Sequence, residues 1–296
     1  MDDSECSKLA LESVLNRPWP EHSSFKILSV VEPFDPINSA AGAAQWYDWV
    51  SSVNTQRKAD ANSLVEQAVD SLRSSHPDCE SDGEIREDLL PDKTIVEAAE
   101  AWSADLIVLG SHSRRGLERV LLGSIAHSVL QLAPCCVEII KPVSTGSPER
   151  FNVILALDSS PQAEKVLTSV AARPWPEKTV FRLLMVVDSL SESCIGDESA
   201  LNAMNAMREQ EIRVERLRVD LAELAASLRS RSSLSDVSFE ILGGHPRDVI
   251  LKAIEDWPAD FVILGSGGKN ALKRFFLGSV SHAVSLHSSC SVEVVK

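Results

Sequence analysis

The chain has 296 residues, of which 44% are hydrophobic and 24% are charged, a composition typical of a soluble globular protein that forms packed cores. Its formal net charge of −14 argues against a nucleic-acid-binding surface, which needs clustered basic residues. A small nucleotide is still possible, because a local turn of backbone N–H groups can hold a phosphate. No apolar run approaches the roughly 20 residues of a membrane-spanning helix. The first five residues lack the features of a signal peptide, so we expect a cytoplasmic protein.

The six cysteines include no C-x-x-C pair, and this argues against a zinc knuckle or a thioredoxin-like redox site. Cys135 and Cys290 precede similar valine-rich segments, and we interpret them as small buried residues. The sequence therefore predicts no metal site.

An internal repeat dominates the sequence. The segment RPWPE at residues 17–21 recurs at residues 173–177, an offset of 156, and Gly110 matches Gly265 at an offset of 155. A period this long indicates a duplicated domain, not a short structural repeat.

The boundary between the copies falls in the segment KPVSTGSP at residues 141–148, which has the composition of a linker. We therefore expect two domains, residues 1–142 and residues 151–296. A chain of this length allows each of them its own core.

In chain order, the first copy shows an apolar run at residues 104–109 followed by Gly110, Ser111 and Ser113. Gly123 and Ser124 stand ten residues further on. A short apolar run that leads into such a turn is typical of a buried strand followed by a helix start.

The second copy gives a complete series of elements. Strands are expected at residues 151–157, 180–187, 237–241, 259–264 and 292–295, with helices from 161 to about 173, from about 200 to 231, from 246 to 257 and from 279. Alternating strands and helices predict a parallel, doubly wound, five-stranded sheet of flavodoxin-like (Rossmann-like) α/β type. Ligands of such sheets bind outside the carboxyl ends of the strands, where Asp158 and Gly265 both lie.

The glycine-rich turn after residues 259–264 is the strongest functional signal. It contains Gly265 and Gly268, and Gly278 and Ser279 follow after nine residues. Glycines let the backbone approach an anion, and the free N–H groups of the following helix start point at it. The spacing therefore predicts a phosphate site.

With Asp158 upstream, the pattern G-x2-G-x9-G-S resembles that of the universal stress protein family, in a tandem form that covers the whole chain. The resemblance implies an adenine-nucleotide-binding fold, usually paired, in which the glycine turn holds ATP. Magnesium could accompany the nucleotide. The resemblance also implies an internal pseudo-dimer of the two domains. Since each final strand offers an edge, two chains could pair further.

Carried over by position, the resemblance gives each residue of the second copy a role. Asp158 would face the adenosine, and Val186 would contact adenine through its backbone. Gly265 and Gly268 would line the ribose and phosphates. The phosphates would be held by Gly278, Ser279 and Val280. A helix-start role for Asp158 is the plainer alternative.

The first copy departs from this pattern, and we expect it to be the poorer nucleotide site. Its matching residues are Asp2, Gly110, Gly123 and Ser124, but Ser113 replaces the second glycine. Because Asp2 aligns with Asp158, the seven residues that match 151–157 are absent. Loss of a central strand would leave its neighbours without hydrogen-bond partners. A misplaced start codon or a truncation is our hypothesis for this loss.

The sequence leaves three functions open. The first is a nucleotide-binding sensor or regulator of the stress response, which we favour because no general base for hydrolysis is evident. The second is a nucleotide-independent interaction protein that uses the pseudo-dimer. The third is a slow ATPase or self-phosphorylating enzyme.

Overall fold

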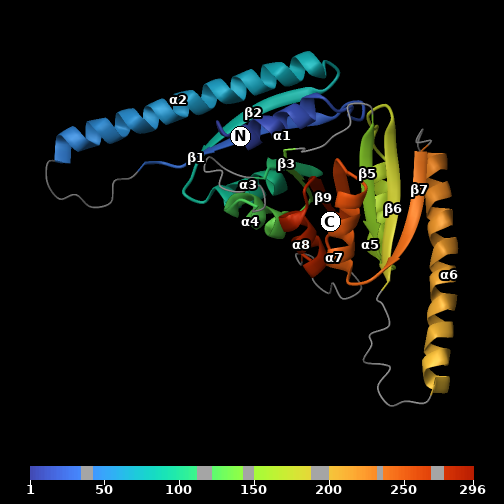
Figure 1. Ribbon diagram of the computed structural model, residues 1–296. Coiled ribbons are helices and arrows are strands. Elements are labelled where there is room, and N and C mark those ends of the chain that lie inside the picture. The colour runs from blue at the N-terminus through green and yellow to red at the C-terminus, as the bar shows by residue number, and fades with distance from the viewer. Residues whose placement is uncertain (35–42, 112–121, 143–149, 188–199, 232–235, 268–276) are drawn as a thin grey trace. The chain divides into compact units, whose positions relative to one another are not determined.

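The computed structural model describes residues 1–34, 43–111, 122–142, 150–187, 200–231, 236–267 and 277–296. By its internal contacts the chain divides into two compact units. Unit 1 is Met1–Cys135 and unit 2 is Cys136–Lys296 (Figure 1).

Unit 2 contains the complete α/β series. Its elements are β4 (Cys136–Ile140), β5 (Phe151–Leu157), α5 (Pro161–Ala171), β6 (Thr179–Val187), α6 (Ala200–Arg231), β7 (Asp236–Gly243), α7 (Pro246–Asp256), β8 (Phe261–Gly265), α8 (Ser279–His287) and β9 (Ser291–Val295). The strand order within this unit is β4-β9-β8-β5-β6-β7. β9, β8, β5, β6 and β7 run parallel, which confirms the predicted doubly wound five-stranded sheet for the second copy.

The central strands of unit 2 form because their residues are apolar on both faces, as a sheet covered by helices on both sides requires. In β5, Val153, Ile154 and Leu155 are fully buried. The helix that follows begins where expected, since Ser160 is its N-cap and accepts a hydrogen bond from the Gln162 N–H group. This strand-to-helix step places Asp158 at the carboxyl end of the central strand.

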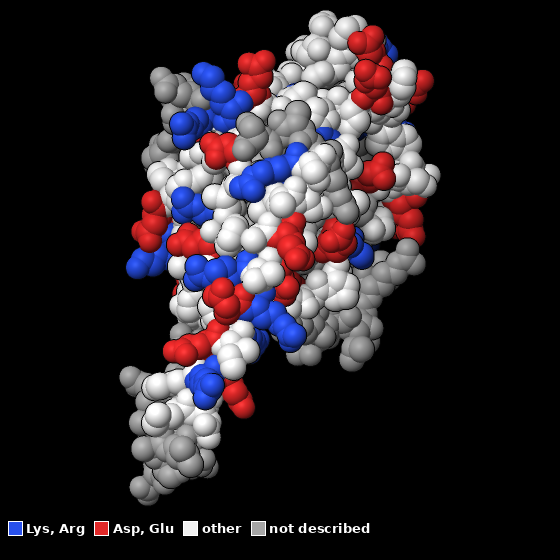
Figure 2. Space-filling model, turned by 90° about the vertical axis from the view of Figure 1, so that its right-hand side faces the viewer, with Lys and Arg blue, Asp and Glu red and all other residues white. Residues whose placement is uncertain are grey.

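The long helix α6 shows two different faces. Leu217, Leu221 and Leu228 are buried in the core of unit 2. The exposed face carries charges of both signs, including an Arg218–Glu215 ion pair with a nitrogen-to-oxygen distance of 3.6 Å. Figure 2 shows acidic and basic side chains mixed over this face, with no continuous basic patch among the described residues.

Unit 1 contains seven elements among its described residues. They are α1 (Glu5–Leu15), β1 (Ser24–Val31), α2 (Ala43–Ser75), β2 (Glu80–Glu87), α3 (Pro91–Trp102), β3 (Leu106–Gly110) and α4 (Ser124–Leu132). β1 and β2 form a parallel sheet of only two strands. A full flavodoxin-like sheet in the first copy is therefore not what the structure shows.

The strand pairing of the two units shows where they differ. In unit 2, β5 pairs with β6 on one edge and with β8 on the other. The counterparts of β6 and β8 in unit 1 are β1 and β3. Within the described part of unit 1 no strand precedes α1, so nothing joins these two strands into one sheet.

Met1 lies beside β1, bonded to two of its residues. Its ammonium donates to the Leu28 carbonyl, and the Ser29 hydroxyl donates to the Met1 carbonyl at 2.7 Å. By the repeat offset of 156, Met1 and Ser29 correspond to Leu157 and Met185, which pair in the β5–β6 ladder. Met1 thus occupies the position that corresponds to Leu157, and the offset places the counterparts of residues 151–156, six positions instead of the expected seven, before the first residue of the sequence.

The final strands of the two copies do not both offer open edges. β4, from the end of the first copy, pairs antiparallel with β9. The expectation that the edge of β9 is free for a second chain is therefore wrong. No helix among the described residues is both long and apolar enough to cross a membrane.

Candidate functional site

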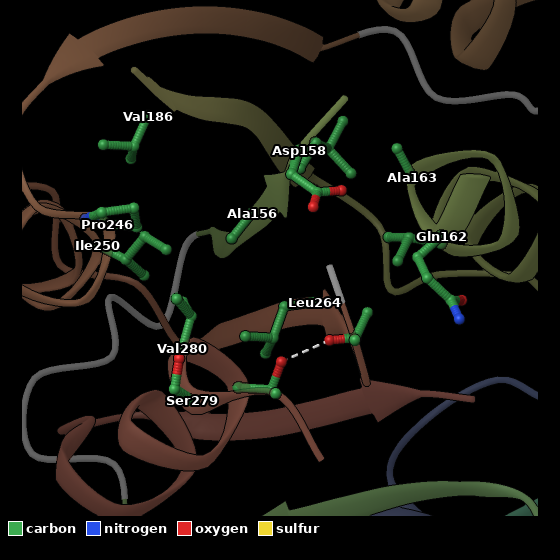
Figure 3. Close-up of a pocket in the computed structure, with 16 residues that line it drawn as sticks. Ala156, Asp158, Gln162, Ala163, Val186, Pro246, Ile250, Leu264, Ser279 and Val280 are labelled. Carbon is green, nitrogen blue, oxygen red and sulfur yellow. Dashed lines mark hydrogen bonds between the residues drawn. The ribbon is translucent and has the colours of Figure 1, made fainter. Parts of the chain in front are cut away.

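A cavity of about 340 Å³ lies in unit 2 at the carboxyl ends of the strands (Figure 3). It is lined by Ala156, Leu157, Asp158, Gln162, Ala163, Val166, Val186, Pro246, Ile250, Leu264, Gly265, Gly267, Gly278, Ser279, Val280 and Ser281. Its volume is within the usual range of small-molecule pockets, about 300 to 1,000 Å³. These residues come from β5, α5, β6, α7, β8 and α8, so the cavity lies where a parallel α/β sheet binds its ligands.

Asp158 follows β5 directly and points into the cavity (Figure 3). One carboxylate oxygen, Oδ1, accepts hydrogen bonds from the Ser160 hydroxyl and from the Ser160 N–H group, the latter at 3.1 Å. These bonds fix the side chain at the start of α5. The helix-start role is therefore present, and it leaves the second oxygen, Oδ2, for another partner.

The glycine turn brings backbone close to the cavity wall. A Cβ atom on Gly265 would lie 2.8 Å from Cβ of Gln162, which is closer than side chains normally approach. The Gly278 N–H group donates to the Ser266 carbonyl at 2.6 Å, and this bond closes the turn.

The N-terminus of α8 points at the cavity with its backbone groups exposed. Gly278 is the N-cap residue and provides no side-chain hydrogen bond. The N–H groups of the first helical turn are therefore left for a ligand, and the helix dipole favours an anion there. Ser279 and Val280 of this turn line the cavity (Figure 3).

The side chain of Ser281 links the end of β8 to the first turn of α8. Its hydroxyl donates to the Gly265 carbonyl at 2.5 Å, the bond drawn as a dashed line in Figure 3. This bond fixes the distance between the end of β8 and the first turn of α8.

The opposite side of the cavity is apolar. Val186, Pro246 and Ile250 lie together there, as Figure 3 shows. The ladder between β5 and β6 ends at the pair Leu157 and Met185, so Val186 extends one residue beyond it. Its backbone edge toward β5 therefore faces no strand, and such an edge can bond the polar rim of a flat ring.

The cavity carries little titratable chemistry. Among the described residues that line it, Asp158 alone has an ionisable side chain. In the described part of the chain, no group of three or more histidine, cysteine, aspartate or glutamate side chains could hold a metal ion.

The first copy repeats the local motifs of this site. Oδ1 of Asp2 accepts from the Ser4 N–H group at 3.1 Å and from its hydroxyl at 2.6 Å. Gly123 is the N-cap residue of α4, with φ −61° and ψ 152°, and Ser124 is the first residue of that helix. The corresponding angles at Gly278 are −64° and 151°.

The surroundings of Gly110 differ from those of Gly265. A Cβ atom on Gly110 would lie 2.3 Å from the carbonyl oxygen and 2.4 Å from the carbonyl carbon of Cys6. Cys6 corresponds to Gln162, where only side-chain atoms come this near. The backbone of α1 therefore lies against the end of β3, on the spot that corresponds to the cavity wall in unit 2.

The structure thus brings together six of the seven residues predicted for the second copy. Asp158, Val186, Gly265, Gly278, Ser279 and Val280 all line the cavity. Gly268 lies outside the described residues, and so does Ser113 of the first copy.

Sequence reasoning missed several lining residues. Gln162, Pro246, Ile250 and Ser281 line the cavity but were not predicted. The Gln162 side-chain oxygen, Oε1, is buried without a hydrogen-bond partner. Pro246 and Ile250 could have been found from their place on the helix after a strand end, whereas no sequence signal marks the direction of the Gln162 side chain.

The whole chain is similar to proteins of one family. The sequence model of the universal stress protein family matches residues 1–141 and again residues 150–296. A universal stress protein of Mycobacterium tuberculosis is 29% identical over 250 residues, which cover 82% of this chain and 77% of the relative. A universal stress protein of Methanocaldococcus jannaschii is 50% identical over 52 residues, which cover 18% of this chain and 31% of the relative.

Among solved structures, a universal stress protein from Archaeoglobus fulgidus aligns with a TM-score of 0.61 at 19% identity. The alignment covers 100% of this chain and 96% of that one. At this identity the likeness concerns the fold alone.

Proposed function

Because the chain belongs to the universal stress protein family, with two of its domains in tandem, we propose that it binds ATP or a related adenine nucleotide in the cavity of unit 2. The observation that carries the proposal is the convergence of three features in one cavity. These are the bare helix start at Gly278, the carboxylate of Asp158 and the apolar side around Val186.

Each feature suits one part of such a ligand. Phosphates would lie at the first turn of α8, where free N–H groups and the helix dipole stabilise negative charge. The free oxygen of Asp158 would accept a hydrogen bond from the adenosine, and the open backbone edge of Val186 would contact adenine. Gly268 would complete the phosphate turn by the family pattern.

We assign the chain a sensing or regulatory role in the stress response in preference to enzymatic turnover. The free oxygen of Asp158 is assigned to the adenosine in this proposal, and the other described lining residues offer no second ionisable group. A base that activates water needs a free, oriented acceptor near the terminal phosphate.

Isothermal titration of the purified full chain with ATP, with and without magnesium, tests the binding proposal. We expect saturable binding with one site per chain. Gly278→Val should weaken it at least a hundredfold, since the added methyl groups occupy the space of a phosphate. A Cβ at this position would meet its nearest neighbour, the Ser266 carbonyl oxygen, at 3.3 Å, so the variant should still fold.

The matching change Gly123→Val reports on the first copy, and we expect it to alter affinity by less than about twofold. Titration with GTP is the control for selectivity toward adenine over guanine. Failure of the wild-type chain to bind any adenine nucleotide would favour the nucleotide-independent interaction protein. Release of inorganic phosphate that Gly278→Val abolishes would favour the enzyme instead.

A further inference from the structure

The backbone carbonyl of Gly265, a residue that lines the cavity of unit 2, lies beyond the end of a strand ladder. The ladder between β5 and β8 ends one residue earlier, at the pair Ala156 and Leu264. On the other side of β8, the Ser266 N–H group donates to the Val295 carbonyl of β9 at 2.7 Å. Successive residues of a strand direct their polar groups to opposite sides, so the Gly265 carbonyl faces the side of β5, where the ladder provides no further donor.

Ser281 supplies a donor for this carbonyl. Its hydroxyl donates to the Gly265 carbonyl at 2.5 Å, as Figure 3 shows. Ser281 is the third residue of α8 and is buried, 5% exposed. The bond therefore runs from the first turn of the helix to the end of β8, and it is made beneath the surface of the cavity wall.

This bond bears on the binding of an anion. The phosphates of the proposed nucleotide would lie at the first turn of α8, beside the end of β8. A carbonyl oxygen carries partial negative charge, and it repels an anion more strongly in a cavity than in water. A buried carbonyl without a donor also destabilises the turn to which it belongs. A hydroxyl that holds the Gly265 carbonyl from the side of the helix removes both effects.

The first copy has the same backbone turn without this hydroxyl. In both copies the N-cap glycine donates its N–H group to the carbonyl of the residue that follows the strand, at 2.7 Å for Gly123 and at 2.6 Å for Gly278. The counterpart of Ser281 is Ala126, which is equally buried. The turn therefore forms without the serine, and the hydroxyl has another role.

We propose that Ser281 is a positioning residue of the nucleotide site: by holding the Gly265 carbonyl, it prepares the end of β8 and the first turn of α8 for phosphate. The inference rests on the proposed function and adds a residue outside the G-x2-G-x9-G-S pattern. The hydroxyl acts on the ligand only through the groups that it joins. Its effect therefore concerns the phosphates and not the adenosine.

Isothermal titration of the purified full chain and its variants with ATP is the test. Ser281→Ala should weaken ATP binding about tenfold, because the Gly265 carbonyl loses its donor beside the phosphates. Ser281→Thr keeps a hydroxyl and should bind within about twofold of the wild-type chain. The affinity of Ser281→Ala for adenosine, measured by competition with ATP, should also change by less than about twofold, because adenosine carries no phosphate.

Ser285→Ala is the matched control. Ser285 lies one turn later on α8 and is fully buried, and its hydroxyl donates to the Ser281 carbonyl of the same helix at 2.8 Å. The change removes a buried hydroxyl without touching Gly265, so the affinity for ATP should stay the same. Ala126→Ser, the reciprocal change in the first copy, should leave it unchanged as well.

The outcomes separate this inference from the proposed function. A wild-type chain that binds no adenine nucleotide would overturn both. Binding of ATP by the wild-type chain with equal affinity in Ser281→Ala would overturn the positioning role alone. Equal losses in Ser281→Ala and Ser285→Ala, or equal losses for ATP and adenosine, would do the same, since they indicate a general loosening of α8.

Discussion

The candidate site in unit 2 and its counterpart in unit 1 share their local motifs and differ in their surroundings. Asp158 and Asp2 make the same bonds to the serine two residues later. Gly278 and Gly123 have almost the same backbone angles at a helix start. Among the described residues, a central strand that separates the two neighbouring strands occurs in unit 2, where β5 lies between β6 and β8 and carries the carboxylate to the rim of a cavity.

This difference teaches that the caps and turns of the site are encoded within a few residues, whereas its shape depends on a strand far from the glycines. In unit 1 the first turn of α1 lies with its backbone against Gly110. In unit 2 the first turn of α5 reaches Gly265 only with side-chain atoms of Gln162.

The largest expected effect comes from a matched pair of core truncations. Phe181→Ala should lower the free energy of unfolding of unit 2 by about 3–5 kcal/mol, because the fully buried ring leaves a cavity. Phe25→Ala at the matching position should cost about 1–2 kcal/mol, because this ring is half-buried. Hydrogen exchange of β6 and β1, read by mass spectrometry, measures the two losses separately.

Both rings have an edge-to-face tryptophan neighbour, at 5.1 Å between ring centroids for Phe181 with Trp175 and at 5.5 Å for Phe25 with Trp19. The two rings share this kind of neighbour and differ in how much of the ring is buried. Equal losses at the two positions would show that unit 1 is as closely packed as unit 2.

Much of this contrast could be predicted from the sequence, because it follows from alignment of the two copies. The alignment of Asp2 with Asp158 placed the counterpart of β5 before Met1, and the G-x2-G-x9-G-S spacing predicted a phosphate site. The packing of β1, β3 and α1 could not be predicted, since it depends on contacts between elements far apart in the sequence. No local sequence pattern shows that β1 pairs only with β2 in the described part of the chain, or that the backbone of Cys6 lies against Gly110.

The same holds for the finer parts of the site in unit 2. The Ser281 hydroxyl bonds the Gly265 carbonyl across the turn, and its counterpart in the first copy is Ala126. The sequence shows that serine is replaced by alanine. That the serine hydroxyl bonds the Gly265 carbonyl can be seen only once the direction of the side chain is known. Pairing of β4 with β9 likewise joins residues about 155 positions apart, and hydrophobic periodicity carries no information on such partners.

A second matched pair, with a smaller expected effect, tests the close approach of α1. Gly110→Ala should destabilise unit 1 by about 2–3 kcal/mol, because the new methyl group would meet backbone atoms of Cys6 that cannot move alone. Gly265→Ala should cost less, about 1–2 kcal/mol, because a Cβ there would have a single contact below 3 Å, at 2.8 Å to Cβ of Gln162, instead of three with Cys6. Chemical denaturation followed by hydrogen exchange in β3 and β8 measures both.

The reverse order of these two costs would contradict the arrangement of α1 described above. Ser103→Ala is the control variant in unit 1. Ser103 has φ 56°, and the change to alanine removes only its hydroxyl. A change in that variant as large as that of Gly110→Ala would indicate general fragility of unit 1 instead of a specific contact.

The third comparison concerns a lysine that occurs in both copies, Lys141 and Lys296. Lys141 follows β4 and is buried in unit 2, where its ammonium donates to the Ser288 carbonyl at 2.8 Å. Burial lowers its pKa from 10.5 to about 8. Burial also raises the pKa of the neighbouring Cys290 thiol from 9.0 to about 11. Lys296 is only half-buried.

The two shifts have opposite consequences for stability. Between pH 8 and 10.5 the unfolded chain binds more protons at Lys141 than the folded chain does, so stability rises with pH. Between pH 9 and 11 the folded chain keeps the Cys290 proton that the unfolded chain loses, so stability falls with pH. We therefore expect a net rise of about 1.4 kcal/mol from pH 8 to 9 and little change from there to pH 10.

Urea unfolding across this pH range, with variants at each position, separates the two groups. Lys141→Met should remove the rise and leave a decline above pH 9. Cys290→Ala should extend the rise to about pH 10.5, where the total gain reaches about 3 kcal/mol. Lys296→Met should leave the dependence of stability on pH unchanged, because Lys296 is only half-buried whereas Lys141 is buried. Identical profiles for the wild-type chain and Lys141→Met would mean that the ammonium is hydrated and that the C-terminus of α8 is held by other contacts.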